Sequence, residues 1–264
     1  MRFGIIGAGN MANAIISGIL KKEILPKEEI ICSSPTEDVR KKIEDKYGVL
    51  TTPSNLEVVH RAGIVLLAVK PQVAQQVIAE IRDDVQNEQV VISIIAGKTI
   101  EWFEQEFERP IKLIRTMPNT PALVGEGMTG VCPSKHITGG ELVQAMQILN
   151  AFGKAEVVPE SLMNAVCAVS ASSPAYVFMM IEAMADGAVH LGMPRDKAYR
   201  FAAQAVMGSA KMVLETGLHP AELKDRVTSP GGTTIEGVRV LEDAGFRSAI
   251  IEAMDASAEA ASSL

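Results

Sequence analysis

The stretch GIIGAGNMANA, residues 4–14, decides the fold of the N-terminal half of the chain. A short apolar run ends in Gly7-Ala-Gly9-Asn-Met-Ala12, and a helical pattern of apolar residues begins at once. In this G-x-G-x-x-A form, Gly7 permits a sharp turn, Gly9 lets backbone approach a diphosphate, and Ala12 allows close packing of a helix on the strand. The N–H groups and the positive dipole end of that helix would face the phosphates of a dinucleotide. The stretch therefore predicts a first strand, a tight turn and a helix, with a dinucleotide site at the turn.

Length and composition narrow the class of protein. The chain has 264 residues, which suits one large or two modest domains. Its 25 Lys+Arg and 32 Asp+Glu give a net charge of −7, which argues against a broad nucleic-acid surface. Cys32, Cys132 and Cys167 show no C-x-x-C spacing, so we expect free thiols in a reducing compartment, and no metal-ligand spacing stands out. No apolar run reaches the roughly 18 residues that span a bilayer, and the first strand leaves no room for a signal peptide. We expect a soluble, cytoplasmic protein that binds no nucleic acid and no membrane.

The order of strand-like and helical runs predicts two domains. In residues 1–158, β-rich runs at 2–6, 30–33, 64–69, 90–95 and 111–115 alternate with helical patterns such as 10–21, 37–46 and 72–82. Nearly continuous apolar strands in such alternation predict an α/β fold, with a mostly parallel sheet and helices on both faces. Residues 159–264 read as helical almost throughout, and residues 174–191 are apolar on most faces of a helix. Such a helix must be buried, so we expect this all-α C-terminal domain to form a homodimer.

The end of the second strand-like run indicates which dinucleotide binds. Cys32-Ser33-Ser34-Pro35 lies where sites that prefer NAD carry an acidic residue for the ribose hydroxyls, and no acid is present. Ser33, Ser34 and the nearby Arg40 could instead accept a 2′-phosphate, which favours NADPH, with NADH possible. The alternative is that Ser34 caps the next helix while Arg40 is merely solvated.

Three other strand ends carry candidate contacts, because ligands of such sheets lie beyond the carboxyl ends of the strands. Residues 68–71 (AVKP) and 93–97 (SIIAG) could contact ribose and nicotinamide through their backbone. Residues 115–121 (RTMPNTP) form a loop held rigid by two prolines, in which Asn119 is suited to hold a substrate or the nicotinamide amide. Ordinary strand termination explains the same prolines and glycines equally well.

The SPGGTT turn at residues 229–234 is the candidate substrate site. Thr233 with Glu236 forms a T-x-x-E capping box, so a well-capped helix is one complete explanation. The other is an anion site: Gly231 and Gly232 leave the approach free of side chains, and free N–H groups around Gly232, Thr233 and Thr234 would bind a small carboxylate. The Thr234 hydroxyl could then reach an adjacent substrate atom. The four histidines form no acid–base constellation, and we expect none of them to be catalytic.

Together, GIIGAGNM, AVKP, RTMPNTP and LKDRVTSPGGTTIEGVRVLE (residues 223–242) resemble pyrroline-5-carboxylate reductases. The resemblance implies a Rossmann-like domain, a helical dimerisation domain, and NAD(P)H-dependent reduction of 1-pyrroline-5-carboxylate to L-proline, the last step of proline biosynthesis. It implies that Glu160, Thr233 and Thr234 meet substrate or product, that Thr234 hydrogen-bonds the ring nitrogen, and, more weakly, that Ser172 takes part. The cofactor contacts that it implies are Ile6, Gly7, Ala8, Gly9, Asn10, Met11, Ser34, Asn55, Ala68, Val69, Lys70, Pro71, Ile94, Ile95 and Ala96.

The chain departs from the family pattern at three positions. Ala171 and Ser173 stand where the family usually has glycine, and Arg226 stands where some relatives have asparagine. Two alternative functions remain at this point. The first is another small NADP-dependent imine reductase or 2-/3-hydroxy-acid dehydrogenase, and the dehydrogenase would need a lysine or histidine to protonate an alkoxide. A non-catalytic NADP-binding module would use the SPGGTT turn only as a capped helix start.

Overall fold

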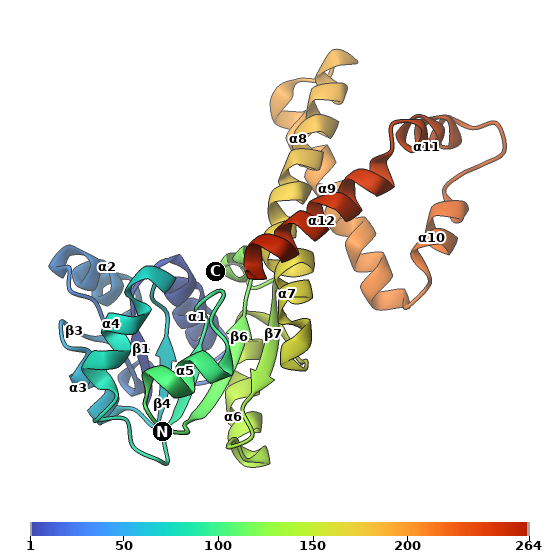
Figure 1. Cartoon of the computed structure of the whole chain (residues 1–264). Coiled ribbons are helices and arrows are strands. Elements are labelled where there is room, and N and C mark those ends of the chain that lie inside the picture. Colours follow the sequence, from blue (N-terminus) through green and yellow to red (C-terminus); the bar gives the residue numbers. More distant parts are fainter. Residues whose placement is uncertain (1, 263–264) are drawn as a thin grey trace. The chain divides into compact units, whose positions relative to one another are not determined.

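The computed structural model describes residues 2–262 (Figure 1). Contacts divide this part of the chain into two units, which are described separately. The first unit contains the chain up to Ser172 together with the segment from Ser257 onward, and the second contains Ser173–Ala256.

The first unit is built on one sheet with the strand order β3-β2-β1-β4-β5-β6-β7-β8. The strands are β1 (Phe3–Ile6), β2 (Ile30–Ser33), β3 (Leu50–Thr52), β4 (Ile64–Leu67), β5 (Val90–Ser93), β6 (Lys112–Met117), β7 (Gly127–Pro133) and β8 (Gly153–Val157). Every neighbouring pair is parallel except β6 and β7. The predicted mostly parallel sheet is confirmed, and β3, β7 and β8 extend it beyond the five runs found in the sequence.

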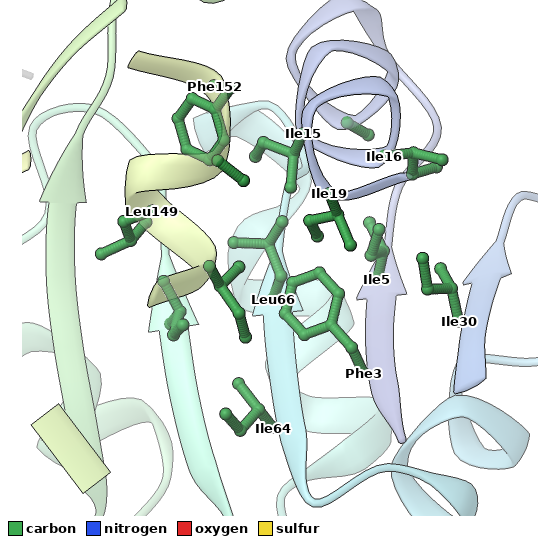
Figure 2. Packing of buried hydrophobic residues seen from close by; sticks show 14 of the residues in the cluster. Phe3, Ile5, Ile15, Ile16, Ile19, Ile30, Ile64, Leu66, Leu149 and Phe152 are labelled. Carbon is green, nitrogen blue, oxygen red and sulfur yellow. The ribbon is translucent and has the colours of Figure 1, made fainter. Parts of the chain in front are cut away.

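Helices cover both faces of this sheet. They are α1 (Asn10–Lys21), α2 (Glu37–Tyr47), α3 (Asn55–Arg61), α4 (Pro71–Ile81), α5 (Ile100–Glu106) and α6 (Gly139–Leu149), with short 3-10 turns at Lys27–Glu29, Thr120–Val124 and Asn150–Phe152. Figure 2 shows one face, where Ile15, Ile16 and Ile19 of α1 pack with Phe3 and Ile5 of β1 and with other buried side chains. On the other face, side chains of α3, α4 and α5 pack against β1, β4 and β5. Strands β1, β2, β4 and β5 are buried along their whole length, which explains why their sequences are apolar without alternation.

The first unit continues past the sheet into an irregular helical segment. A 3-10 turn (Glu160–Leu162) leads into α7 (Met163–Val166) and then into a π-helix (Cys167–Ser172). The buried Met163 packs with Met117 of β6 and Cys132 of β7, which fixes the segment against the sheet. The part of α12 from Ser257 onward also belongs to this unit.

The second unit is entirely helical, as predicted. It comprises α8 (Ser173–His190), α9 (Arg195–Thr216), α10 (Pro220–Arg226), α11 (Thr233–Asp243) and most of α12 (Phe246–Ser262). In α8 only Pro174 and Ala185 are buried, while Phe178 is 63% and Met179 68% exposed. The helix that the sequence predicts to be apolar on most faces therefore exposes large apolar side chains to solvent in the single chain, as the surface of a subunit interface would.

One helical stretch, Glu160–His190, is long and apolar enough to cross a membrane by length and composition alone. The expectation that no apolar run of this length exists is therefore wrong. The stretch carries three acidic residues, Glu160, Glu182 and Asp186, which a lipid-embedded helix disfavours.

Candidate active site

The loops that follow β1, β2, β4 and β5 meet at one edge of the sheet, because parallel strands end on the same side. Backbone hydrogen bonds join these loops: Gly7 N–H donates to the Ser33 carbonyl at 3.1 Å, and Ala68 N–H donates to the Ile6 carbonyl at 2.8 Å. Ile94 N–H, after β5, donates to the carbonyl at the end of β4 at 3.2 Å. The structure thus brings together predicted cofactor contacts from four separate loops.

The glycine turn after β1 has the geometry of a dinucleotide-binding turn. Gly7 adopts φ +103°, and a Cβ there would lie 2.4 Å from the Ala68 carbonyl oxygen, so only glycine fits. Gly9 differs: it is exposed, it is the N-cap of α1, and no atom lies within 4 Å of a Cβ placed on it. Ala12, in the first turn of α1, is fully buried and packs in the core cluster with β1, as predicted for close helix–strand packing.

The start of α1 is suited to an anion. No side chain caps this helix and no acidic residue lies in its first turn. The first-turn N–H groups have no partner within the helix, and the helix dipole adds positive potential at the same point. A cofactor diphosphate therefore fits the space in front of Gly9.

Sequence reasoning missed Asn13, which stabilises this turn from inside the helix. Its side-chain amide donates to the Gly9 carbonyl at 3.0 Å and to the Ala8 carbonyl at 3.3 Å. The only signal in the sequence was a polar residue one turn into the helix, next to the apolar run that packs on the sheet.

The end of β2 carries the hydroxyl groups of Ser33 and Ser34 and lies beside the guanidinium of Arg40. The Ser33 hydroxyl donates to Asn55 Oδ1 at 2.7 Å, and Asn55 Nδ2 donates to Glu80 at 2.8 Å. Arg40 Nη1 donates to the carbonyls of Ser34 at 2.7 Å and Pro35 at 3.1 Å, which holds the guanidinium at the end of the strand. The structure does not show Ser34 capping α2, whose N-cap is Thr36 without a side-chain bond.

A second helix starts at the same edge of the sheet. Lys70 is the exposed N-cap of α4, Pro71 is its first residue, and no side chain caps the helix. Proline at this position leaves no N–H to satisfy and presets the helical φ angle.

The RTMPN stretch at the end of β6 makes contacts that the sequence did not predict. Arg115, whose side chain is 6% exposed, forms an ion pair with Glu160 at 2.8 Å, and Ile100 N–H donates to the same carboxylate oxygen at 2.8 Å. The Asn119 side chain accepts from Met128 N–H at 2.8 Å through Oδ1. Glu160, a predicted substrate contact, is thereby held at the start of the segment that follows the sheet.

The same region contains a cavity of about 610 Å³ whose lining includes Glu160, Glu101, Glu104 and Cys132. Burial raises the pKa of the Cys132 thiol, and the Glu160 carboxylate raises it further, while Arg115 opposes both. Cys132 therefore stays a neutral thiol, which is consistent with packing and not with nucleophilic chemistry.

Ser172, another predicted substrate contact, is the last residue of the π-helix. The Ser257 hydroxyl donates to the Ser172 hydroxyl at 2.8 Å. π-helical turns are rare and often mark functional sites. Ala171 and Ser173, the positions that depart from the family pattern, lie in this π-helix and directly after it.

The SPGGTT turn lies in the second unit, before α11. Gly231 adopts φ +64°, and Gly232 is the N-cap of α11 with no side-chain capping bond. The predicted capping box is wrong: Thr233 is the first helical residue, so it cannot cap, and Glu236 instead pairs with Arg239 at 3.1 Å. The expectation of a free N–H at Gly232 is also wrong, because this group donates to the Ser229 carbonyl at 3.0 Å. The N–H groups of Thr233 and Thr234 lie in the first turn of α11, where the helix offers them no acceptor.

Arg226, whose role the sequence left open, lies at the end of α10. It forms an ion pair with Glu222 of the same helix at 2.8 Å. This i,i+4 pair supports α10 and involves no other element of the unit.

A mostly parallel sheet, a glycine turn at the end of β1 and an uncapped helix behind it define a Rossmann-type dinucleotide-binding protein. Residues 2–97 match the family model described as NADP oxidoreductase coenzyme F420-dependent, and residues 160–264 match pyrroline-5-carboxylate reductase dimerisation.

Curated relatives and solved structures agree with the family models. The chain is 50% identical to the pyrroline-5-carboxylate reductase of Escherichia coli over 96% of this chain and 94% of that one. The structure matches that of a Coxiella burnetii pyrroline-5-carboxylate reductase with TM-score 0.92 and 33% identity, covering 98% and 97% of the two chains. It also matches the Plasmodium falciparum enzyme solved with NADP bound, with TM-score 0.90 and 30% identity over 100% and 97% of the chains. The chain belongs to the pyrroline-5-carboxylate reductase family.

Proposed function

We propose that this chain reduces the C=N bond of 1-pyrroline-5-carboxylate with NADPH to give L-proline and NADP⁺, as an oxidoreductase acting on CH–NH groups. The observation that carries the proposal is the match of nearly the whole chain to reductases of this name, together with the open helix start behind the glycine turn. In the balanced reaction, a hydride goes to the imine carbon and a proton goes to the ring nitrogen.

The cofactor would lie along the sheet edge. The N–H groups of Asn10 and Met11 would bind the diphosphate, since they begin an uncapped helix with no acidic residue in its first turn. Ser34 and Arg40 would bind the 2′-phosphate, because the Arg40 guanidinium is already fixed at the end of β2. The backbone of the loops at 68–71 and 94–96 would contact the ribose and the nicotinamide of the cofactor.

The substrate carboxylate would be bound by the first-turn N–H groups of α11, at Thr233 and Thr234. Gly231 and Gly232 leave the approach free of side chains, and the dipole of α11 favours a negative charge there. Glu160 and Ser172 would complete the contacts with the substrate.

For hydride transfer, the protein then only has to position the substrate against the cofactor and make one polar contact to the imine nitrogen. NADPH supplies the hydride when it is bound. Thr234 would hydrogen-bond the ring nitrogen, which makes the imine carbon more electron-poor, and the helix start would hold the carboxylate so that the ring cannot rotate. No histidine or lysine is needed for an alkoxide, because the reduced atom pair is C=N.

We further propose a homodimer formed through the C-terminal helices, with a domain boundary at residue 158. The apolar side chains that α8 leaves uncovered support the homodimer, as does the match to a dimerisation family from residue 160. A cytoplasmic location fits a reductase that draws on NADPH and keeps three free cysteines.

The test is an NADPH oxidation assay with 1-pyrroline-5-carboxylate, run on wild type, Thr234→Ala and Thr216→Ala. Thr216 is an exposed threonine whose hydroxyl makes only local bonds: it donates to the Met212 carbonyl of its own helix α9 at 2.7 Å and accepts from Leu218 N–H at 3.3 Å. Its variant is therefore the matched control. We expect Thr234→Ala to lower kcat/KM on the order of 10- to 1000-fold, the range for one lost polar contact or proton donor, and Thr216→Ala to change it less than about twofold. Wild-type activity in Thr234→Ala would refute the residue's role, and consumption of NADPH only with keto acids would refute the reaction.

A further inference from the structure

The Asn119 side chain is 9% exposed, and its amide is bonded at both ends to backbone, nine positions away at one end and 51 positions away at the other. Its Oδ1 accepts from Met128 N–H at 2.8 Å, and its Nδ2 donates to the Ser170 carbonyl at 3.0 Å. Met128 belongs to β7 and Ser170 to the π-helix. The Asn119 side chain therefore ties the sheet to the π-helix, with one bond donated and one accepted.

The π-helix needs such external contacts because its wide turn is intrinsically less stable than an α-helical turn. Within it, the Ser170 hydroxyl donates back to the Val166 carbonyl at 3.1 Å. From α12, the Ser257 hydroxyl donates to Ser172 at 2.8 Å. Asn119 thus bonds the π-helix through a backbone carbonyl, and Ser257 bonds it through the side chain two residues further on.

We propose that Asn119 and Ser257 are positioning residues that hold the π-helix so that Ser172 is presented to the substrate. The inference rests on the proposed function, in which Ser172 meets the substrate. It differs from the assignment that sequence alone suggested for Asn119, namely a direct contact with nicotinamide or substrate. Its consequence is that loss of either residue weakens substrate binding and leaves cofactor binding intact.

Asn119→Asp is the first test, with Asn150→Asp as its matched control. The aspartate keeps an acceptor for Met128 N–H but loses the donor to the Ser170 carbonyl. The side-chain amide of Asn150, at the end of α6, also makes one donated and one accepted bond to backbone. It donates to the Met146 carbonyl at 2.8 Å and accepts from Ala155 N–H at 3.0 Å. We expect Asn119→Asp to raise KM for 1-pyrroline-5-carboxylate about tenfold or more, as for one lost buried hydrogen bond, while the Kd for NADPH stays within about twofold. The control should change neither.

Ser257→Ala keeps the inference testable if Asn119→Asp does not fold. Its control is Ser248→Ala, in the same helix α12, whose hydroxyl donates only to Glu252 at 2.7 Å. We expect Ser257→Ala to raise KM severalfold with unchanged Kd for NADPH, and Ser248→Ala to change neither. Unchanged KM in Ser257→Ala, or a raised Kd for NADPH with unchanged KM in Asn119→Asp, would overturn the inference.

Amide hydrogen exchange separates this inference from the proposed function. In Asn119→Asp, we expect amides of residues 167–173 to exchange about tenfold faster than in wild type, whether or not the enzyme is active. If wild type fails to reduce 1-pyrroline-5-carboxylate, the proposed function fails. Faster exchange of these amides in Asn119→Asp would still show that Asn119 holds the π-helix. If exchange in this segment is unchanged, Asn119 does not hold the π-helix and the inference fails by itself.

Discussion

Substitution of alanine at two glycines of one turn should impair two different properties, stability at Gly7 and cofactor binding at Gly9. Alanine at Gly7 would need φ +103° and would place its Cβ 2.4 Å from the Ala68 carbonyl oxygen, against backbone that is itself part of the sheet edge. Left-handed backbone costs a residue other than glycine about 1–2 kcal/mol, and forcing a methyl into packed structure costs about 1–3 kcal/mol more. Gly7→Ala should therefore lower the free energy of unfolding by about 2–5 kcal/mol.

Alanine at Gly9 meets no atom within 4 Å, so the folded chain accommodates it. Because alanine is a poorer N-cap than glycine, the variant should lose only about 0.5–1 kcal/mol of stability. The new methyl would stand where the diphosphate approaches the α1 N–H groups. Each charge-assisted hydrogen bond is worth about 1.5–3 kcal/mol, so the Kd for NADPH should rise on the order of 10- to 100-fold.

Urea unfolding of the free protein and fluorescence titration with NADPH measure the two effects separately. Gly7→Ala should fail mainly in the first assay and Gly9→Ala mainly in the second. If Gly9→Ala is as unstable as Gly7→Ala and binds NADPH like wild type, the assignment of the turn as a phosphate site is refuted.

Three further predictions concern charge, pH and assembly. Arg40→Ala should raise the Kd for NADPH about tenfold and leave that for NADH within about twofold, since only NADPH carries the 2′-phosphate; equal effects on both would contradict the Arg40 assignment. Burial raises the pKa of the Cys32 thiol from 9.0 to about 12, so the contribution of the neutral thiol to stability is complete below pH 9 and is lost as the pH rises from 9 through 12. Between pH 9 and 12, the free energy of unfolding should fall by about 1.4 kcal/mol per pH unit more in wild type than in Cys32→Ala. Parallel plots of unfolding free energy against pH for the two proteins would rule out this pKa shift. Phe178→Glu should sediment as a monomer, because it places a charge on the exposed apolar surface of α8. The control Val73→Glu changes an exposed apolar position of the first unit and should not alter assembly. A dimeric Phe178→Glu would exclude α8 from the interface.

Much of the first unit could be predicted from the sequence, because buried parallel strands and a glycine turn have strong local signatures. The range 10–21 predicted for the first helix coincides with α1, and 30–33 coincides with β2. β7 and β8 were missed for physical reasons. β7 (GMTGVCP) contains two glycines and a terminal proline, and β8 (GKAEV) is a half-exposed edge strand with two charges, so neither resembles a buried strand.

The candidate site was predictable only where its residues lie next to strand ends. The hydrogen bond between Asn119 and Ser170 joins residues 51 positions apart, and Ser170 lies in a π-helix. No local sequence pattern predicts either this bond or the π-helix. The capping box failed because a T-x-x-E pattern does not fix where a helix starts. The extended backbone of Gly232 makes it the N-cap, which moves Thr233 inside the helix.

A crystal structure of the protein with NADP⁺ and L-proline would test the central claim most directly. We predict the diphosphate on the N–H groups of Asn10 and Met11, the proline carboxylate on those of Thr233 and Thr234, and the proline nitrogen within hydrogen-bond distance of the Thr234 hydroxyl. Proline bound away from the start of α11, with Thr234 facing only solvent, would contradict the account.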